Sequence, residues 1–221
     1  MTAGNSADGL NQEVSAATTI SSTGLTIPSG ATFLGCVLAS ADGGSTIGPT
    51  AVSMTWNGTP MSPGPTNTVT GGGQNAFTQI FYLINPAAGT GPMVANWTTA
   101  RDMYMSGTAF NGTDTVTGIN AADNQTATNV TTITVTSAAN DATLASFACN
   151  AAAPTVNFTK IYAEAPLSPG GGANYTLGGT SNAHTFTGAG GTLQALVGIH
   201  ILAGTGGSQP PSSVRRIYIN P

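Results

Sequence analysis

The stretch FTQIFYLI, from Phe77 to Ile84, decides the fold class of this chain. Its residues are almost all apolar, and the turn-forming pair Asn85-Pro86 follows it directly. A short apolar run that ends at a turn signal is typical of a strand buried in a sheet, because helices usually need longer segments. We therefore expect a buried β-strand at this position.

Similar short segments recur outward from this stretch in both directions, and clusters of Gly, Pro, Asn and Asp separate them. The expected strands are Ala16–Ile20, Leu25–Pro28, Thr32–Ser40, Val52–Trp56, Met93–Thr98, Met103–Phe110, Asn129–Ser137, Thr143–Cys149, Val156–Tyr162 and Leu193–Leu202. No stretch shows helical periodicity. About ten to twelve short strands at close spacing predict an all-β fold, an antiparallel, jelly-roll-like β-sandwich.

Some details of this pattern are more specific. Thr32–Ser40 is the most apolar segment and is expected to be central, and Met93–Thr98 is expected to pair with Met103–Phe110. A shift in alternation between Val130 and Ile133 indicates a β-bulge. We expect hairpin turns at Asn57-Gly58, Asn111-Gly112 and Asn140-Asp141, an irregular loop at Pro166–Ala173, and weak edge strands marked by Tyr175, His184 and Phe186.

Charge is scarce along the chain. Only 5% of the 221 residues are Asp, Glu, Lys or Arg, and the formal net charge is −4; an average domain has roughly 25% charged residues. The basic residues are Arg101, Lys160, Arg215 and Arg216. So few cations cannot neutralise many phosphates, and we expect no nucleic-acid partner.

The sequence also bears on localisation. No apolar run reaches the roughly 20 residues of a membrane helix, so we expect no membrane partner. The start of the chain has neither a basic region nor an apolar core typical of a signal peptide. We therefore expect synthesis in the cytoplasm.

The domain organisation follows from composition. Residues 1–13 are expected to form a flexible N-terminal arm, 14–203 the β-sandwich, and 204–221 a Gly/Pro-rich linker that ends in an anchoring peptide. The expected docking residues of that peptide are Val214, Arg215, Arg216, Ile217, Tyr218 and Ile219. An extended peptide of this kind can add a strand to a neighbouring sheet; the alternative is that it folds back onto its own domain.

The chain contains few side chains that are suited to catalysis. His200 lies in an apolar strand, where a satisfied core or sheet-face histidine is expected, and His184 lies in a polar stretch expected to be a loop or edge. No G-x-S-x-G or P-loop motif occurs. We expect the aspartates to stabilise turns, and predict no catalytic residue, metal or cofactor. The residues that could supply calcium ligands, as an alternative, are Asp114, Asp123, Asn111, Asn120 and Asn124.

Two pairs of residues have alternative roles. Cys36 and Cys149 both lie in apolar runs, and two buried thiols are favoured over a disulfide. Trp56 and Trp97 could stack on sugars if they are exposed, although a role as core anchors is favoured.

The segments AVSMTWNGTPM (51–61) and FTQIFYLINPAAGTGPMVANWT (77–98) also carry a family resemblance. They are similar to jelly-roll, lectin-like domains of tailed-phage virion proteins, of decoration or tail-fibre type, and of bacterial surface proteins. TTITVTSAANDATLASFACN (131–150) and ALVGIHIL (195–202) fit the same pattern. The resemblance implies a fold and a general role on a particle surface. It carries no catalytic or ligand-binding residue.

Together these features predict a virion structural protein, most simply a capsid decoration protein. Its expected partners are the major capsid or tail protein, and further copies of itself as a homo-oligomer. The alternative is a carbohydrate-binding or adhesion module that binds a host surface glycan.

Overall fold

The computed structural model describes residues 1–4, 12–42, 48–150, 153–164, 170–187 and 193–204. Within these residues the chain forms antiparallel β-sheets and one short 3₁₀ turn, η1 (Ala121–Asp123). The predicted all-β sandwich is confirmed. None of the helical structure in the described part of the chain is long and apolar enough to cross a membrane.

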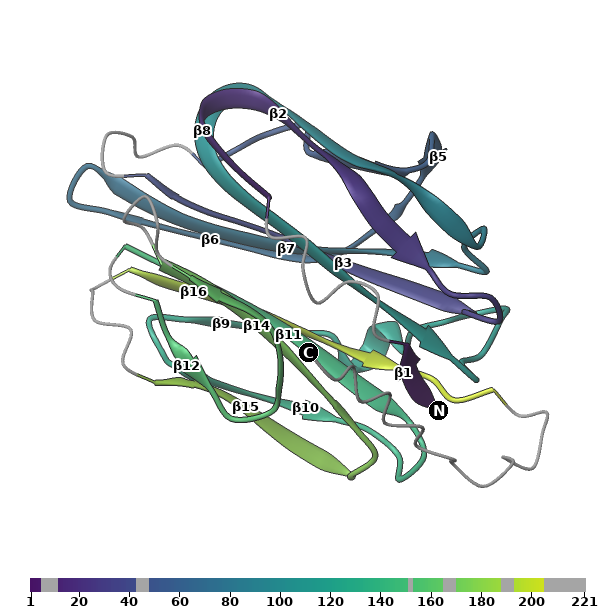
Figure 1. Ribbon diagram of the computed structural model, residues 1–221. Coiled ribbons are helices and arrows are strands. Elements are labelled where there is room, and N and C mark those ends of the chain that lie inside the picture. The colour runs from purple at the N-terminus through teal and green to yellow at the C-terminus, as the bar shows by residue number, and fades with distance from the viewer. Residues whose placement is uncertain (5–11, 43–47, 151–152, 165–169, 188–192, 205–221) are drawn as a thin grey trace, which may run out of the picture.

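Three sheets make up the structure (Figure 1). The largest contains β1 (Thr2–Gly4), β2 (Gln12–Ile27), β3 (Phe33–Asp42), β4 (Ser53–Trp56), β5 (Thr59–Pro60), β6 (Ser62–Gly71), β7 (Gln74–Ile84) and β8 (Gly89–Asn111). Its order is β5-β4-β8-β3-β7-β6, and β1 and β2 also pair with β8. The five-stranded sheet has the order β13 (Thr159–Glu164), β14 (Gly170–Leu177), β11 (Ala142–Cys149), β16 (Gln194–Ile201) and β9 (Gln125–Thr128). The three-stranded sheet has the order β10 (Thr132–Thr136), β15 (Ser181–Thr187) and β12 (Thr155–Val156).

The long strand β8 makes the largest sheet curl. Its first part pairs with β4, its second part pairs with β3, and β2 runs beside both parts. The expected pairing of Met93–Thr98 with Met103–Phe110 is therefore wrong, because both segments belong to this one strand. Residues 99–102 contain no Gly or Pro to turn the chain back. Instead the register with β2 slips around Ala17, which lets the strand bend.

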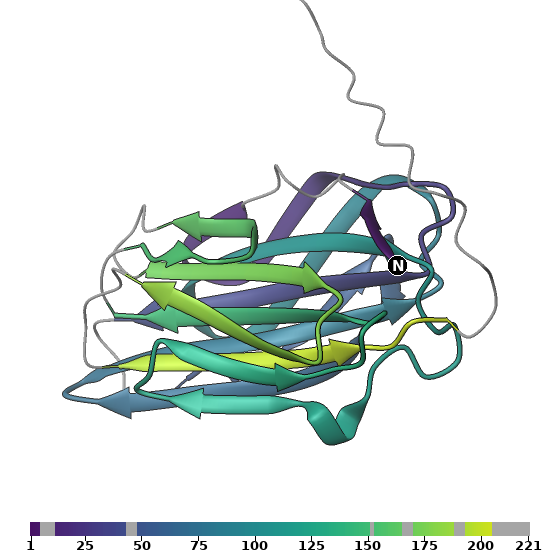
Figure 2. The same ribbon diagram turned by 90° about the horizontal axis from the view of Figure 1, so that it is seen from below.

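Hydrophobic clusters fill the space between the layers of the stack. Figure 2 shows the ribbon of this stack from the side of the three-stranded sheet. On β3, Phe33 and Val37 face the five-stranded sheet, while Leu34 and Cys36 face the inside of the curl. Because side chains alternate across a strand, β3 is buried on both faces, as its apolar sequence predicts. The strand predicted at Phe77–Ile84 is likewise confirmed within β7.

The five-stranded sheet is also covered on both sides. Its outer face packs against the three-stranded sheet through a cluster that contains Phe147, Cys149, Phe186 and Leu196. The rings of Phe147 and Phe186 stack with their centroids 5.0 Å apart. Consequently, every residue of β11 and β16 is buried.

Several local expectations need correction. Residues 170–173 belong to β14 rather than to a loop, and a Cβ built on Gly172 would lie 2.9 Å from Pro154 Cγ. Close packing therefore explains this glycine. The single strand expected at Val156–Tyr162 is two strands, β12 and β13, in different sheets. Strands β14 and β15 each have partners on both sides, so neither is an edge.

The turn at Asn57-Gly58 is confirmed, with φ values of 46° and 79° that suit a type I′ hairpin. The shift expected between Val130 and Ile133 is a break between strands: Asn129 has a φ of 55°, and β10 begins at Thr132. Cys36 and Cys149 are both buried and form no disulfide with each other, so the prediction of two buried thiols is confirmed.

The described residues include only part of each terminal segment. Of the expected N-terminal arm, residues 2–4 form β1, residues 12–13 begin β2, and 5–11 lie outside the described residues. The anchoring peptide expected at 214–219 lies outside the described residues.

The contact between Gly198 and Val135 tests how tightly the outer layers pack. A Cβ built on Gly198 would lie 2.5 Å from Val135 Cγ2. We expect Gly198→Ala to lower the free energy of unfolding by about 1–3 kcal/mol through overpacking. In a Val135→Ala background the same substitution should cost less than half as much, as measured by urea denaturation. Simple addition of the two losses would contradict this account.

Candidate functional site

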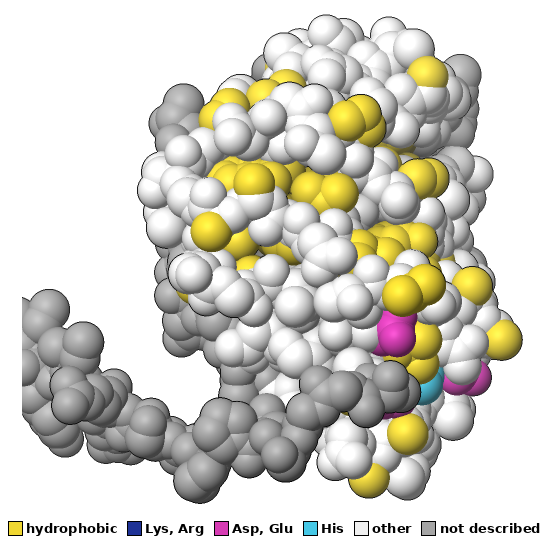
Figure 3. All heavy atoms as spheres, turned by 90° about the vertical axis from the view of Figure 1, so that its right-hand side faces the viewer, with side chains coloured by type: hydrophobic (Ala, Val, Ile, Leu, Met, Phe, Trp, Pro, Cys, Tyr) yellow, Lys and Arg dark blue, Asp and Glu magenta, His cyan; other side chains and the backbone are white. Residues whose placement is uncertain are grey.

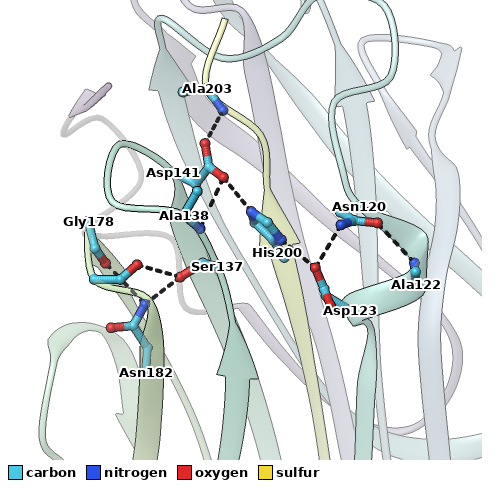
Figure 4. A network of polar contacts seen from close by, with 11 residues as sticks. Asn120, Ala122, Asp123, Ser137, Ala138, Asp141, Gly178, Asn182, His200 and Ala203 are labelled. Carbon is cyan, nitrogen blue, oxygen red and sulfur yellow. Dashed lines mark hydrogen bonds and ion pairs between the residues drawn. The ribbon is translucent and has the colours of Figure 1, made fainter.

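A network of polar side chains lies at one end of the sandwich, where several turns meet (Figure 4). At its centre is His200 on β16. The ring Nδ1 lies 2.9 Å from Asp123 Oδ2 in η1, and Nε2 lies 2.5 Å from Asp141 Oδ2, just before β11. The histidine side chain is 6% exposed, that of Asp141 9% and that of Asp123 27%. The network is thus largely withdrawn from solvent.

Local turn chemistry orients both carboxylates. Asn120 caps η1 by accepting a hydrogen bond from the Ala122 N–H, and its Nδ2 donates to Asp123 Oδ2 at 2.7 Å. Asp141 closes the turn before β11, donating its N–H to the Ala138 carbonyl and accepting the Ala138 N–H on its side chain. The expectation that these aspartates stabilise turns is confirmed.

Both ring nitrogens of His200 face carboxylate oxygens. Ionised carboxylates only accept hydrogen bonds, so both contacts are hydrogen bonds only when both ring nitrogens carry a proton. Neither nitrogen is then free to take a proton from a substrate. The expected satisfied histidine in an apolar strand is confirmed, and the arrangement suits a structural clamp better than a catalytic dyad.

Asp114, at the same end, stabilises the loop that follows it. One carboxylate oxygen accepts hydrogen bonds from the N–H groups of Thr117, Val116 and Gly118. The bonds from Thr117 and Val116 lower the pKa of this exposed carboxyl, and partial burial opposes them. Among the described residues, no group of three or more His, Cys, Asp or Glu side chains could hold a metal ion, so the calcium alternative gains no support there.

The second histidine corrects an expectation. His184 is fully buried beneath the three-stranded sheet rather than on a loop or edge. Its Nε2 lies 2.8 Å from Thr143 Oγ1 and its Nδ1 lies 2.5 Å from Asn174 Oδ1. Burial lowers its pKa to about 3, so the ring is neutral at pH 7.

This hydroxyl–imidazole–amide order resembles a nucleophile, a base and an orienting group. All three residues, Thr143, His184 and Asn174, are nevertheless 0% exposed between two packed sheets. Asn174 continues the chain of contacts to Asn157, which ties the turn between β12 and β13 to β15. The group therefore acts as a buried polar network that joins the sheets.

The tryptophans are core anchors. Trp56 is 1% exposed and Trp97 is 4% exposed, and both lie inside the curl of the large sheet. Trp56 also donates its ring N–H to the Ala87 carbonyl at 3.3 Å. A sugar needs an open ring face, so the glycan-stacking role considered for these two residues is wrong for this structure.

Both ends of the described chain reach the end that carries the His200 network (Figure 1). Gly112 contacts both: a Cβ built on it would lie 3.5 Å from Met1 Cα, and its carbonyl accepts the Gly204 N–H at 2.9 Å. The Ala203 N–H donates to Asp141 Oδ1 at 2.7 Å. Figure 3 shows acidic and histidine side chains together on this end, and no Lys or Arg among the described side chains in view.

The sequence alone could not predict that His200, Asp123 and Asp141 lie together. His200 is 59 positions from Asp141 and 77 from Asp123, and the apolar strand around it indicates only a core position. The one local signal was Asn120 three residues before Asp123, which suits a cap.

The lowered pKa of His184 gives a stability prediction. The unfolded chain takes up this proton near pH 6.5, whereas the folded chain does so only near pH 3, so acid stabilises the unfolded state. Stability should be complete above pH 6.5 and fall by about 1.4 kcal/mol per unit as the pH drops toward 3. Urea denaturation at several pH values measures this loss. His184→Gln, which cannot titrate, should show a shallower dependence; an identical slope would refute the account.

Comparisons with known proteins identify no relative that suggests a function for this chain. No protein-family model matches it, and neither a curated protein nor a solved structure does.

Proposed function

We propose that this protein is a non-enzymatic structural protein of a virus particle, most specifically a capsid decoration protein. The observation that supports the proposal is the meeting of Met1 and Gly204, the two ends of the described chain, beside Gly112 at one end of the stack of sheets. A module attached at that end would present its other surfaces outward. Attachment through terminal segments requires no special surface on the sandwich itself.

The distribution of charge supports this arrangement. All eight acidic residues lie at or before Glu164, and Arg215 and Arg216, half of the basic residues, lie after the sandwich. An acidic body with a basic, β-prone end can bind a partner through that end alone. The partner would be the major capsid or tail protein, bound by strand addition of residues 214–219.

The reach of the terminal segment is sufficient for this role. Residues 205–221 follow Gly204, and an extended chain spans at most about 3.3–3.6 Å per residue, so the segment could bridge on the order of 50 Å. This length allows the peptide to reach a neighbouring subunit without moving the sandwich.

Deletion of residues 214–221 tests the proposal. We expect the truncated protein to keep its thermal stability, because the deletion spares every described strand, but to be lost from particles purified in a density gradient. Mass spectrometry of the particle band gives the copy number. The matched control is Lys160→Ala, which removes an exposed basic residue of the sandwich and should leave the copy number unchanged. Normal occupancy by the truncated protein would refute attachment through this segment.

A second candidate function, binding of a host glycan, has one specific observation in its favour. The outer face of the three-stranded sheet is an uncharged array of hydroxyl groups from Thr132, Thr134, Thr136, Thr155, Ser181, Thr185 and Thr187. Thr132 pairs with Thr185 and Thr155 with Thr187 across the strands, and strand geometry makes their spacing regular. Hydroxyl groups both donate and accept hydrogen bonds, as sugar hydroxyls require.

Thr134→Lys tests this candidate. The substitution places an unpaired charge in the centre of the face and should abolish binding on an array of neutral glycans. Thr26→Lys on the exposed edge strand β2 is the matched control and should bind as the unmodified protein does. An array without signal for the unmodified protein would exclude this function.

A further inference from the structure

The carboxylate of Asp141 connects two features of the end where the chain leaves the sandwich. Its Oδ2 accepts from His200 Nε2, and its Oδ1 accepts from the Ala203 N–H, immediately before the C-terminal segment. One buried group thus contacts both the His200 ring and the backbone at the end of β16 (Figure 4).

The opposite side of the His200 ring contacts η1. Asp123 brings η1 to His200, and backbone hydrogen bonds continue the contact: the Asn120 N–H donates to the His200 carbonyl, and the Leu202 N–H donates to the Gly118 carbonyl. His200 therefore links η1, the turn before β11 and the exit of β16 through one side chain.

We infer that His200 is a proton-dependent clamp that holds these three segments together and fixes the position of residues 202–204, where the chain leaves β16. Both contacts exist only while the ring carries two N–H groups. Loss of one proton places a ring lone pair opposite a carboxylate oxygen, and one contact must break.

The clamp has few competing charges. Around His200, η1 supplies Asp123 and the turn before β11 supplies Asp141, while Asp114 accepts hydrogen bonds from its own loop. Strands β6, β9 and β10, which pack near β16, contain no ionisable residue. On β7, Tyr82 stacks on Phe33, and on β11, Cys149 pairs with Gln194 at the far end of β16. Asp123 and Asp141 are therefore the ionisable side chains that contact the ring among the described residues.

The clamp itself rests on the contacts of the sandwich, and only its consequence for attachment rests on the proposed function. The direct test is NMR of ¹⁵N-labelled full-length protein over pH 5–9. At the acid end we expect both ring nitrogens of His200 to carry protons, and as the pH rises the amide signals of Ala203 and η1 should change over the same range as the ring. A neutral ring at pH 5, or an Ala203 amide that does not follow the ring, would overturn the inference.

Two aspartate variants sharpen the test. Asp123→Asn can donate its amide N–H to a neutral His200, so the network should persist at high pH and the linked change of the Ala203 amide should be lost. Asp114→Asn, at the same end but without a contact to His200, should keep that change. Equal behaviour of the two variants would overturn the clamp. If the clamp titrates as described but the protein without residues 214–221 still occupies particles, the proposed function fails and the clamp stands.

Discussion

Burial of strands on both faces is the constraint on which the structure depends. β11 and β16 are buried at every residue, and β3 contributes to a hydrophobic cluster on each side. A strand in that position cannot carry an unpaired charge, because transfer of a charge away from water is costly. Burial on both faces accounts for the absence of Asp, Glu, Lys and Arg from β11 and β16. Close approach of the layers also explains Gly198, where a Cβ would meet Val135.

The same burial decides the chemistry of the two histidines. His184 faces a hydroxyl and an amide, and burial keeps its ring neutral. His200 faces two carboxylates, to which both ring nitrogens can donate only when the ring carries two protons. The two largely buried rings therefore differ in their partners, which are uncharged for His184 and acidic for His200. Each histidine joins segments that are far apart in the chain, so the polar groups of the interior add cohesion between layers that already pack by apolar contact.

The proposed function depends on the end of the sandwich where Met1 and Gly204, the two ends of the described chain, meet. Gly112 contacts Met1 and Gly204, and the His200 network lies beside this junction. A particle protein attached there could keep its uncharged outer faces free. The clamp and the proposed attachment concern one region but different interactions: the clamp orders the sandwich, whereas the attachment depends on residues beyond it. The hydroxyl face of the three-stranded sheet belongs to another layer and could serve recognition independently.

The sequence by itself determined the all-β class, the central strands and the turns, because apolar runs and Asn-Gly pairs act over a few residues. It also indicated that Cys36 and Cys149 are buried. Only the tertiary structure decided that residues 93–98 and 103–110 form one bent strand, that Trp56 and Trp97 face inward, and that His200 meets Asp123 and Asp141. These features depend on how sheets curl and stack, and periodicity within one strand does not encode which layer covers each face.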